Sequence, residues 1–207
     1  MMTHELSVCL IFFLSFFILI KMSHESHPSR YVIEDKHFAL NNKFVITDES
    51  GGVYYTVDST LFPKGNLTIY DATEKPVIRI RRQSLHLHTV YDIFSVVSDT
   101  EDVELASVKS TGAPWNHKLD ISSTNGEYFM EKRVGTSDHE FVLKQNGDIV
   151  ALVTKDTSPS KSTYWVDIAH DRSEYRAFLI ALVIVLSCVQ RLPGNPLATS
   201  HNGHVKM

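Results

Sequence analysis

The densest group of basic side chains in the sequence could bind a phosphate group. The group is Lys64, Lys75, Arg79, Arg81 and Arg82. In a β-strand, Arg79 and Arg81 would point to one face, and Ile78 and Ile80 to the other. Two guanidinium groups on one face can hold a phosphate through paired hydrogen bonds. These residues therefore predict a site for a phosphoinositide or another anionic lipid headgroup. The alternative is that they form the solvated outer face of a strand.

Metal chemistry receives less support from the sequence. His86 and His88 would point to the same side of a strand, but no nearby cysteine or carboxylate pattern supplies a further ligand. Asp167, Asp171 and Glu174 offer oxygen atoms that calcium could use. However, they lack the alternating acids and the turn glycine of a calcium-binding loop. We predict no metal and no cofactor.

The chain contains none of the common catalytic motifs. A nucleophile elbow, a phosphate-binding P-loop, the H-E-x-x-H zinc motif and a cysteine-histidine cluster are all missing from the sequence. We therefore expect a protein that is not an enzyme. The formal net charge of −4 lacks the basic excess of a general nucleic-acid binder, so no nucleic-acid partner is expected.

The region between residues 31 and 168 has the pattern of short β-strands separated by turns. Typical turn signals are the glycine-containing loop at residues 48–52, Pro76 at the start of a strand, and the Asn146-Gly147 pair. The predicted strands are Tyr31–Leu40, Lys43–Thr47, Val53–Val57, Leu67–Tyr70, Val77–Arg81, Tyr91–Val96, Val103–Val108, His117–Ile121, Tyr128–Arg133, Phe141–Leu143, Ile149–Val153 and Ser162–Ile168. About a dozen strands with regular spacing predict a mainly β domain, either a sandwich or a barrel.

An apolar segment at Ala177–Val189 decides between these two architectures. It is too short for a membrane span, and Asp171 with Glu174 resembles a capping box at the start of a helix. A helix that is apolar on every face must be surrounded by protein. A sandwich core about 10 Å thick has no room for it, whereas a large barrel does. We predict a closed barrel that encloses a central helix at about residues 173–190.

A second apolar segment, Leu6–Ile20, lies near the N-terminus within the predicted segment 1–22. Fifteen helical residues span about 22 Å, which is short for a hydrocarbon core of about 30 Å. Glu5 before the segment and Lys21 after it favour an uncleaved anchor with the domain in the cytosol. Three alternatives stay open: a cleaved secretion signal, an apolar segment tucked against the domain, and a wrongly assigned gene start. Residues 192–207 are predicted to be a disordered tail.

Three segments resemble the LURP-one-related family, which belongs to the tubby C-terminal-like group together with the phospholipid scramblases. They are Phe38–Ser59, Leu67–Phe94 and Glu174–Val189. The second is similar to the family's pattern of a strand, an Asp-Ala turn, an Ile-Arg-Arg strand and a Ser-Leu-His step. The resemblance covers about residues 31–191 and implies a twelve-stranded barrel around a hydrophobic helix. The N-terminal apolar segment is not a standard part of that family.

The resemblance implies more than one function, because the related groups of proteins differ in what they do. Tubby-type members bind phosphoinositides, scramblase-type members act on lipids with calcium, and LURP-one relatives are associated with defence responses. Our first expectation is a membrane-associated barrel whose partner is an anionic lipid. The alternatives are a protein-interaction or signalling scaffold, and a scramblase-like lipid transporter with Phe178–Val189 inserted in the bilayer.

Overall fold

The computed structural model describes residues 29–38, 41–59, 66–83, 89–98, 101–111, 118–136, 139–156 and 162–191. Several sequence predictions lie outside these residues. They are the N-terminal segment 1–22, the tail 192–207, the candidate site residue Lys64, and the histidines His86 and His88.

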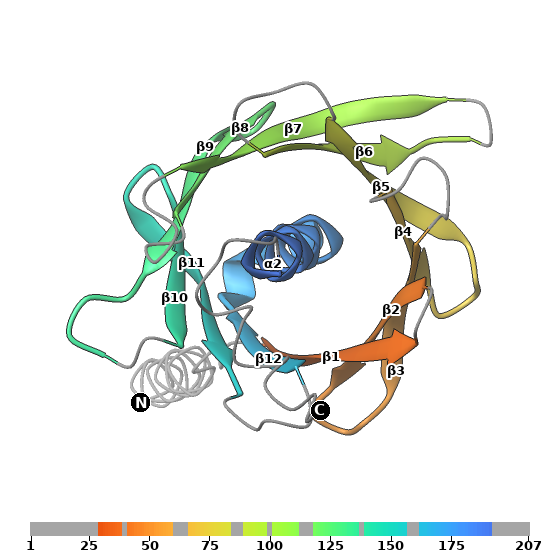
Figure 1. Cartoon of the computed structure of the whole chain (residues 1–207), viewed down its shortest axis with the longest axis horizontal. Helices are drawn as coiled ribbons and strands as arrows, with labels where there is room; N and C mark the ends of the chain where they lie inside the picture. The colour runs from red at the N-terminus through yellow and green to blue at the C-terminus, as the bar shows by residue number, and fades with distance from the viewer. Residues whose placement is uncertain are drawn as a thin grey trace, which may run out of the picture.

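The chain forms a closed antiparallel barrel, as the sequence predicts (Figure 1). Its strands are β1 (Ser29–Phe38), β2 (Asn41–Asp48), β3 (Val53–Ser59), β4 (Leu67–Asp71), β5 (Pro76–Gln83), β6 (Val90–Val96), β7 (Asp102–Thr111), β8 (Lys118–Ser123), β9 (Gly126–Lys132), β10 (Glu140–Gln145), β11 (Asp148–Lys155) and β12 (Ser162–Ile168). Each strand pairs with its neighbours in sequence, and β1 pairs with β12 from Ser29 opposite Ile168 to Asp35 opposite Ser162. This last pairing closes the barrel and removes its edges.

Two aspartates, Asp48 at the end of β2 and Asp71 at the end of β4, stabilise the turns in which the chain reverses direction. The Asp48 carboxylate accepts hydrogen bonds from the backbone N–H groups of Ser50 and Gly52, both at 2.9 Å. Asp71 accepts bonds in the same way from the N–H groups of Thr73, at 2.8 Å, and Lys75, at 3.0 Å. The hydroxyl groups of Ser50 and Thr73 donate to the same two carboxylates, and together with the backbone bonds they favour the ionised form and lower the pKa of Asp48 and of Asp71.

The turn between β10 and β11 confirms the strongest hairpin signal in the sequence. Asn146 and Gly147 both have positive φ, at 51° and 95°. Such a turn matches the twist of the two flanking strands, and asparagine and glycine tolerate it better than other residues. Gly147 therefore cannot be replaced by a β-branched residue without strain.

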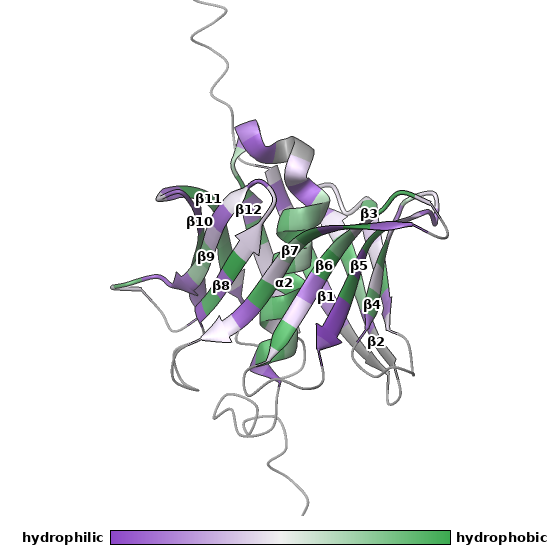
Figure 2. Cartoon of the chain, turned by 90° about the horizontal axis from the view of Figure 1, so that it is seen from above, coloured by the Kyte–Doolittle hydropathy of each residue, from purple (hydrophilic) through white to green (hydrophobic). Residues whose placement is uncertain are grey.

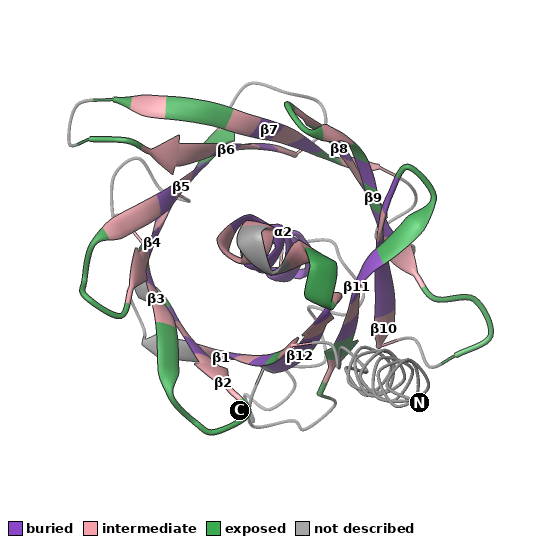
Figure 3. Ribbon diagram, turned by 180° about the vertical axis from the view of Figure 1, so that it is seen from behind, coloured by how far each residue is buried: buried purple, intermediate pink, exposed green. Residues whose placement is uncertain are grey.

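The centre of the barrel is filled by the helix α2 (Arg176–Gln190), which follows the 3₁₀ helix η1 (His170–Tyr175). Figures 2 and 3 show α2 as an apolar, buried element inside the ring of strands. Ile180 to Leu186 are fully buried. Alternate strand residues point inward and pack against it, for example Ile33 and Ile93. The core cluster runs from Tyr31 to Val189, so residues 29–191 contain a complete hydrophobic core.

The beginning of α2 differs from the prediction. The capping-box interpretation of Asp171 and Glu174 is wrong, because the α-helix begins at Arg176. Residues 170–175 instead form the tighter 3₁₀ turn that leads the chain from the end of β12 into the barrel. The cap residue Tyr175 makes no side-chain hydrogen bond to the helix N-terminus, and Asp171 pairs with Arg172 at 3.3 Å. In the part of the chain that the structure describes, no helix combines the length and apolarity needed to cross a membrane.

Candidate functional site

The two arginines of the candidate site lie on the outer surface of β5. Ile78 and Ile80 point into the core, with exposed fractions of 4% and 0%, whereas Arg79 and Arg81 alternate with them and point outward. This arrangement follows from the pleat of the strand. The side chain of Arg79 is 27% exposed and that of Arg81 is 48% exposed, so solvent reaches both guanidinium groups.

Asp102, at the start of β7, binds both arginines. Its Oδ1 accepts a hydrogen bond of 2.6 Å from Arg79 Nη1, and its Oδ2 accepts one of 2.5 Å from Arg81 Nη2. The Asp102 side chain is only 9% exposed, because the arginines cover it. Two positive charges therefore share one negative charge, and the cluster keeps a net charge of about +1. We call Arg79, Arg81 and Asp102 the arginine clasp.

Two further features surround the arginine clasp. The guanidinium carbon of Arg81 lies 4.6 Å from the centre of the Phe94 ring on β6, which restricts the orientation of the side chain by a cation–π contact. An open groove of about 220 Å³ lies beside the clasp, between β4 and β5. The residues that line the groove are Asn66, Leu67, Thr68, Arg79, Ile80 and Arg81. Its polar side chains come from two paired strands, because Thr68 is the direct partner of Arg79.

The structure does not bring all five predicted residues together. Arg82 lies on the same side of β5 as Ile78 and Ile80, but it is exposed because it lies at the rim of the barrel. Its backbone N–H donates to Asn66 Oδ1 over 3.4 Å. Lys75 lies in the turn before β5. Arg81 lies six positions further along the chain, which corresponds to about 20 Å of extended strand. Lys64 lies outside the described residues. Arg79 and Arg81 are therefore the predicted residues that face the groove.

Sequence reasoning missed a polar network inside the barrel, at the C-terminal end of α2. Gln190 is 3% exposed, and its Oε1 accepts hydrogen bonds from Tyr164 Oη at 2.9 Å and from Lys155 Nζ at 3.0 Å. Arg191 donates to Ser187 Oγ at 2.8 Å. Burial lowers the pKa of Lys155 and lowers that of Arg191 to about 10. The sequence signal for this network was Gln190-Arg191 directly after the apolar segment, because the backbone carbonyl groups at the end of a helix need polar partners.

Arg191 also forms an ion pair with Asp35 of β1. The pair connects the end of α2 to the first strand of the barrel. The positive charge of Arg191 stabilises the C-terminus of α2, where the backbone carbonyl groups carry a partial negative charge. Both the network and the ion pair therefore fix the helix end inside the barrel.

Two of the acidic residues before α2, Asp167 and Asp171, each pair with an arginine. Asp167 is occupied by Arg30, which donates to its two carboxylate oxygens over 2.6 and 3.0 Å. Within the described ranges, no three histidine, cysteine, aspartate or glutamate side chains gather closely enough to hold a metal ion.

A family model described as LURP-one-related matches residues 29–187, which include all twelve strands and most of α2. The chain belongs to the LURP-one-related family. An X-ray structure of a protein from Arabidopsis thaliana is similar to the chain, with a TM-score of 0.54 and 22% identity. The match covers 80% of this chain and 94% of the other. This similarity shows the fold alone. No curated protein matches the chain.

Proposed function

We propose that this LURP-one-related barrel is a non-enzymatic, membrane-associated binding module that recognises the phosphate of an anionic lipid headgroup. The observation that carries the proposal is the arginine clasp at the open groove between β4 and β5. Phosphoinositides are the lipid class that the proposal favours, and they belong to the cytosolic leaflet. The proposal therefore places the barrel on the cytosolic side of a membrane.

The chemistry of the clasp supports binding of a phosphate. A guanidinium group has five N–H donors. Asp102 takes one hydrogen bond from each arginine, so donors of Arg79 and Arg81 stay available for a ligand. The carboxylate also holds the two side chains in place before a ligand arrives, which reduces the entropy lost on binding. Asn66 and Thr68 add a side-chain amide and a hydroxyl at the edge of the groove.

The position of α2 favours this proposal over a scramblase-like transporter. Such a transporter would need Phe178–Val189 in the bilayer, and in the structure this stretch is enclosed by the barrel. A protein-interaction scaffold would bind no lipid, so the vesicle-binding experiment described next distinguishes it from our proposal.

The test is co-sedimentation of residues 23–207 with vesicles, since this chain retains the complete core cluster. Neutral vesicles serve as the baseline, and vesicles with phosphatidylserine are compared with vesicles with a phosphoinositide at matched total charge. We expect preferential pelleting with the phosphoinositide. A soluble inositol phosphate, added as competitor, distinguishes a headgroup site from general attraction to the membrane surface.

The double variant Arg79→Ala/Arg81→Ala should weaken this binding by at least about tenfold, because it removes two charge-assisted interactions. Lys109→Ala/Arg133→Ala is the control that removes the same charge, since both residues are exposed and lie outside the groove. Equal effects of the two changes would mean that charge alone matters and that the groove is not the site. A folded protein that pellets with none of the vesicles would favour the scaffold function instead.

A further inference from the structure

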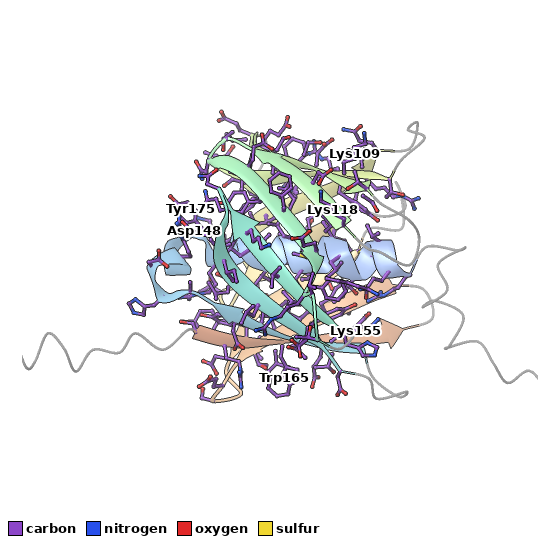
Figure 4. The ribbon with its side chains drawn as sticks, turned by 90° about the vertical axis from the view of Figure 1, so that its left-hand side faces the viewer. Lys109, Lys118, Asp148, Lys155, Trp165 and Tyr175 are labelled. Atoms are coloured by element: carbon purple, nitrogen blue, oxygen red, sulfur yellow. The ribbon has the colours of Figure 1, made fainter. Side chains whose placement is uncertain are left out.

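Four apolar side chains form a continuous stripe on the outer surface, on the side of the barrel away from β5 (Figure 1). Val142 of β10 pairs directly with Leu152 of β11, and Trp165 of β12 pairs directly with Val32 of β1. Leu152 pairs with Asp167, so Trp165 is its diagonal neighbour and lies within reach of it. Figure 4 shows Trp165 pointing away from the barrel. We call these four residues the apolar stripe.

The apolar stripe is open to solvent at Trp165, which is 42% exposed. Val142 is 5% exposed, although it lies on the outer surface and outside the core cluster. Other apolar side chains on the outer surface are about half exposed, with Val103 at 47% and Ile149 at 53%. The neighbouring Lys144–Glu131 ion pair borders Val142 on one side. None of the described strands or helices lies over the stripe, so the exposed face of Trp165 is open to a further apolar group.

We propose that the N-terminal segment Leu6–Ile20 of the same chain packs on the apolar stripe. The segment contains no charged residue and is rich in leucine, isoleucine and phenylalanine. As a helix it would be about 22 Å long. The stripe crosses four adjacent strands, a width of about 14 Å. The segment is therefore long enough to cover all four side chains.

The chain enters the barrel at the right place for this contact. β1 begins at Ser29 and carries Val32, one end of the apolar stripe. Residues 21–28 connect Ile20 to Ser29, and eight extended residues reach at most about 28 Å. A tether this short keeps the segment at an effective concentration in the millimolar range. The same chain therefore reaches the stripe more readily than a second copy does.

This docking is a different use of the segment from a membrane anchor, because one segment cannot cover the stripe and span a bilayer at the same time. It leaves the groove between β4 and β5 free, since that groove lies on another face. The inference therefore goes beyond the proposed lipid site and does not depend on it.

Cross-linking of the native Cys9 tests the docking in the full chain. Cys188→Ala leaves Cys9 as the only native thiol. A second cysteine is then introduced at Leu152, in the stripe, or at Lys109, an exposed residue of β7. We expect a short bis-maleimide to join Cys9 to the cysteine at position 152 within one monomer, and to give much less product at position 109. Equal yields at the two positions, or covalent dimers alone, would overturn the proposal.

Fluorescence of Trp165 gives a second measurement that needs no cross-link. Trp115→Phe leaves Trp165 as the only tryptophan. We expect acrylamide to quench Trp165 less in the full chain than in residues 23–207, with emission at shorter wavelength in the full chain. Identical quenching in both would refute the docking. Recovery of the full chain with neutral vesicles after an alkaline wash would assign the segment to the membrane and would also refute it.

Discussion

Arg79 Nη1 on β5 lies 2.6 Å from Asp102 Oδ1 on β7, so this ion pair crosses the whole width of β6. Arg81 reaches the other oxygen of the same carboxylate. The consequence is that the positive charge on the outer surface is both held in place and reduced by Asp102. Replacing this one residue separates the two effects.

Asp102→Asn should strengthen binding to anionic vesicles, because it raises the net charge of the arginine clasp by one unit. The dependence of binding on salt concentration should become steeper for the same reason. Vesicle titrations at two ionic strengths measure both changes. The variant should lose at most about 1 kcal/mol of unfolding free energy, since the arginines are partly exposed. Weaker binding would mean that the orientation supplied by Asp102 matters more than the added charge.

Gln190→Leu should lower the free energy of unfolding by about 1–3 kcal/mol, because Tyr164 and Lys155 lose a shared acceptor inside the barrel. Adding Tyr164→Phe should recover part of that loss, since the hydroxyl that needs the acceptor is then also removed. Urea denaturation of the single and double variants measures the difference. Strictly additive losses would contradict a direct link between the two residues.

The wild-type protein should lose stability in alkaline solution through Cys188. Burial raises the pKa of this thiol from 9.0 to about 12. The thiol therefore keeps its proton in the folded protein while the unfolded chain ionises. Its contribution to stability is complete below about pH 9 and is lost as the pH rises towards about 12. Urea unfolding across this range should show a steeper decline for the wild type than for Cys188→Ala. Parallel declines would exclude Cys188 as a cause.

Leu182→Ala should lower the free energy of unfolding by about 2–5 kcal/mol, because Leu182 is fully buried in α2 and the barrel cannot collapse around the cavity. Val134→Ala is the control, since Val134 is 97% exposed and its truncation should change stability by less than about 0.5 kcal/mol. Thermal unfolding of both variants tests this. Similar small effects would mean that α2 is not packed as the core of the barrel.

Local patterns were sufficient to predict the barrel. Alternating residues such as Ile78 and Ile80 indicate a strand with one buried face, and Asn146-Gly147 indicates a tight hairpin. The helix that is apolar all round then requires an enclosing wall. These signals are short-range or depend on composition, and they need no knowledge of which strands are neighbours.

The polar contacts between distant parts of the chain could not be predicted from these local patterns. Alternation placed Arg79 and Arg81 on one face, but Asp102 lies 23 residues from Arg79 and reaches it only through the order of β5, β6 and β7. The same limit applies to Lys155, which is 35 residues from Gln190. Lys75 was included because it is near in sequence, although the extended strand carries it away from the groove. Nearness along a strand is a poor guide to nearness in space.

The closure of β1 against β12 around α2 sets an order of events during synthesis. The strand that closes the ring and the helix that fills the interior are both made after the other eleven strands. A ribosome-bound chain that has completed β11 still lacks the strand that seals the ring and the helix that occupies it. Such a chain presents the inward, apolar faces of its strands to solvent, and exposed surface of this kind is prone to aggregation. Premature termination before Ser162 therefore yields an empty, open sheet and not a smaller barrel.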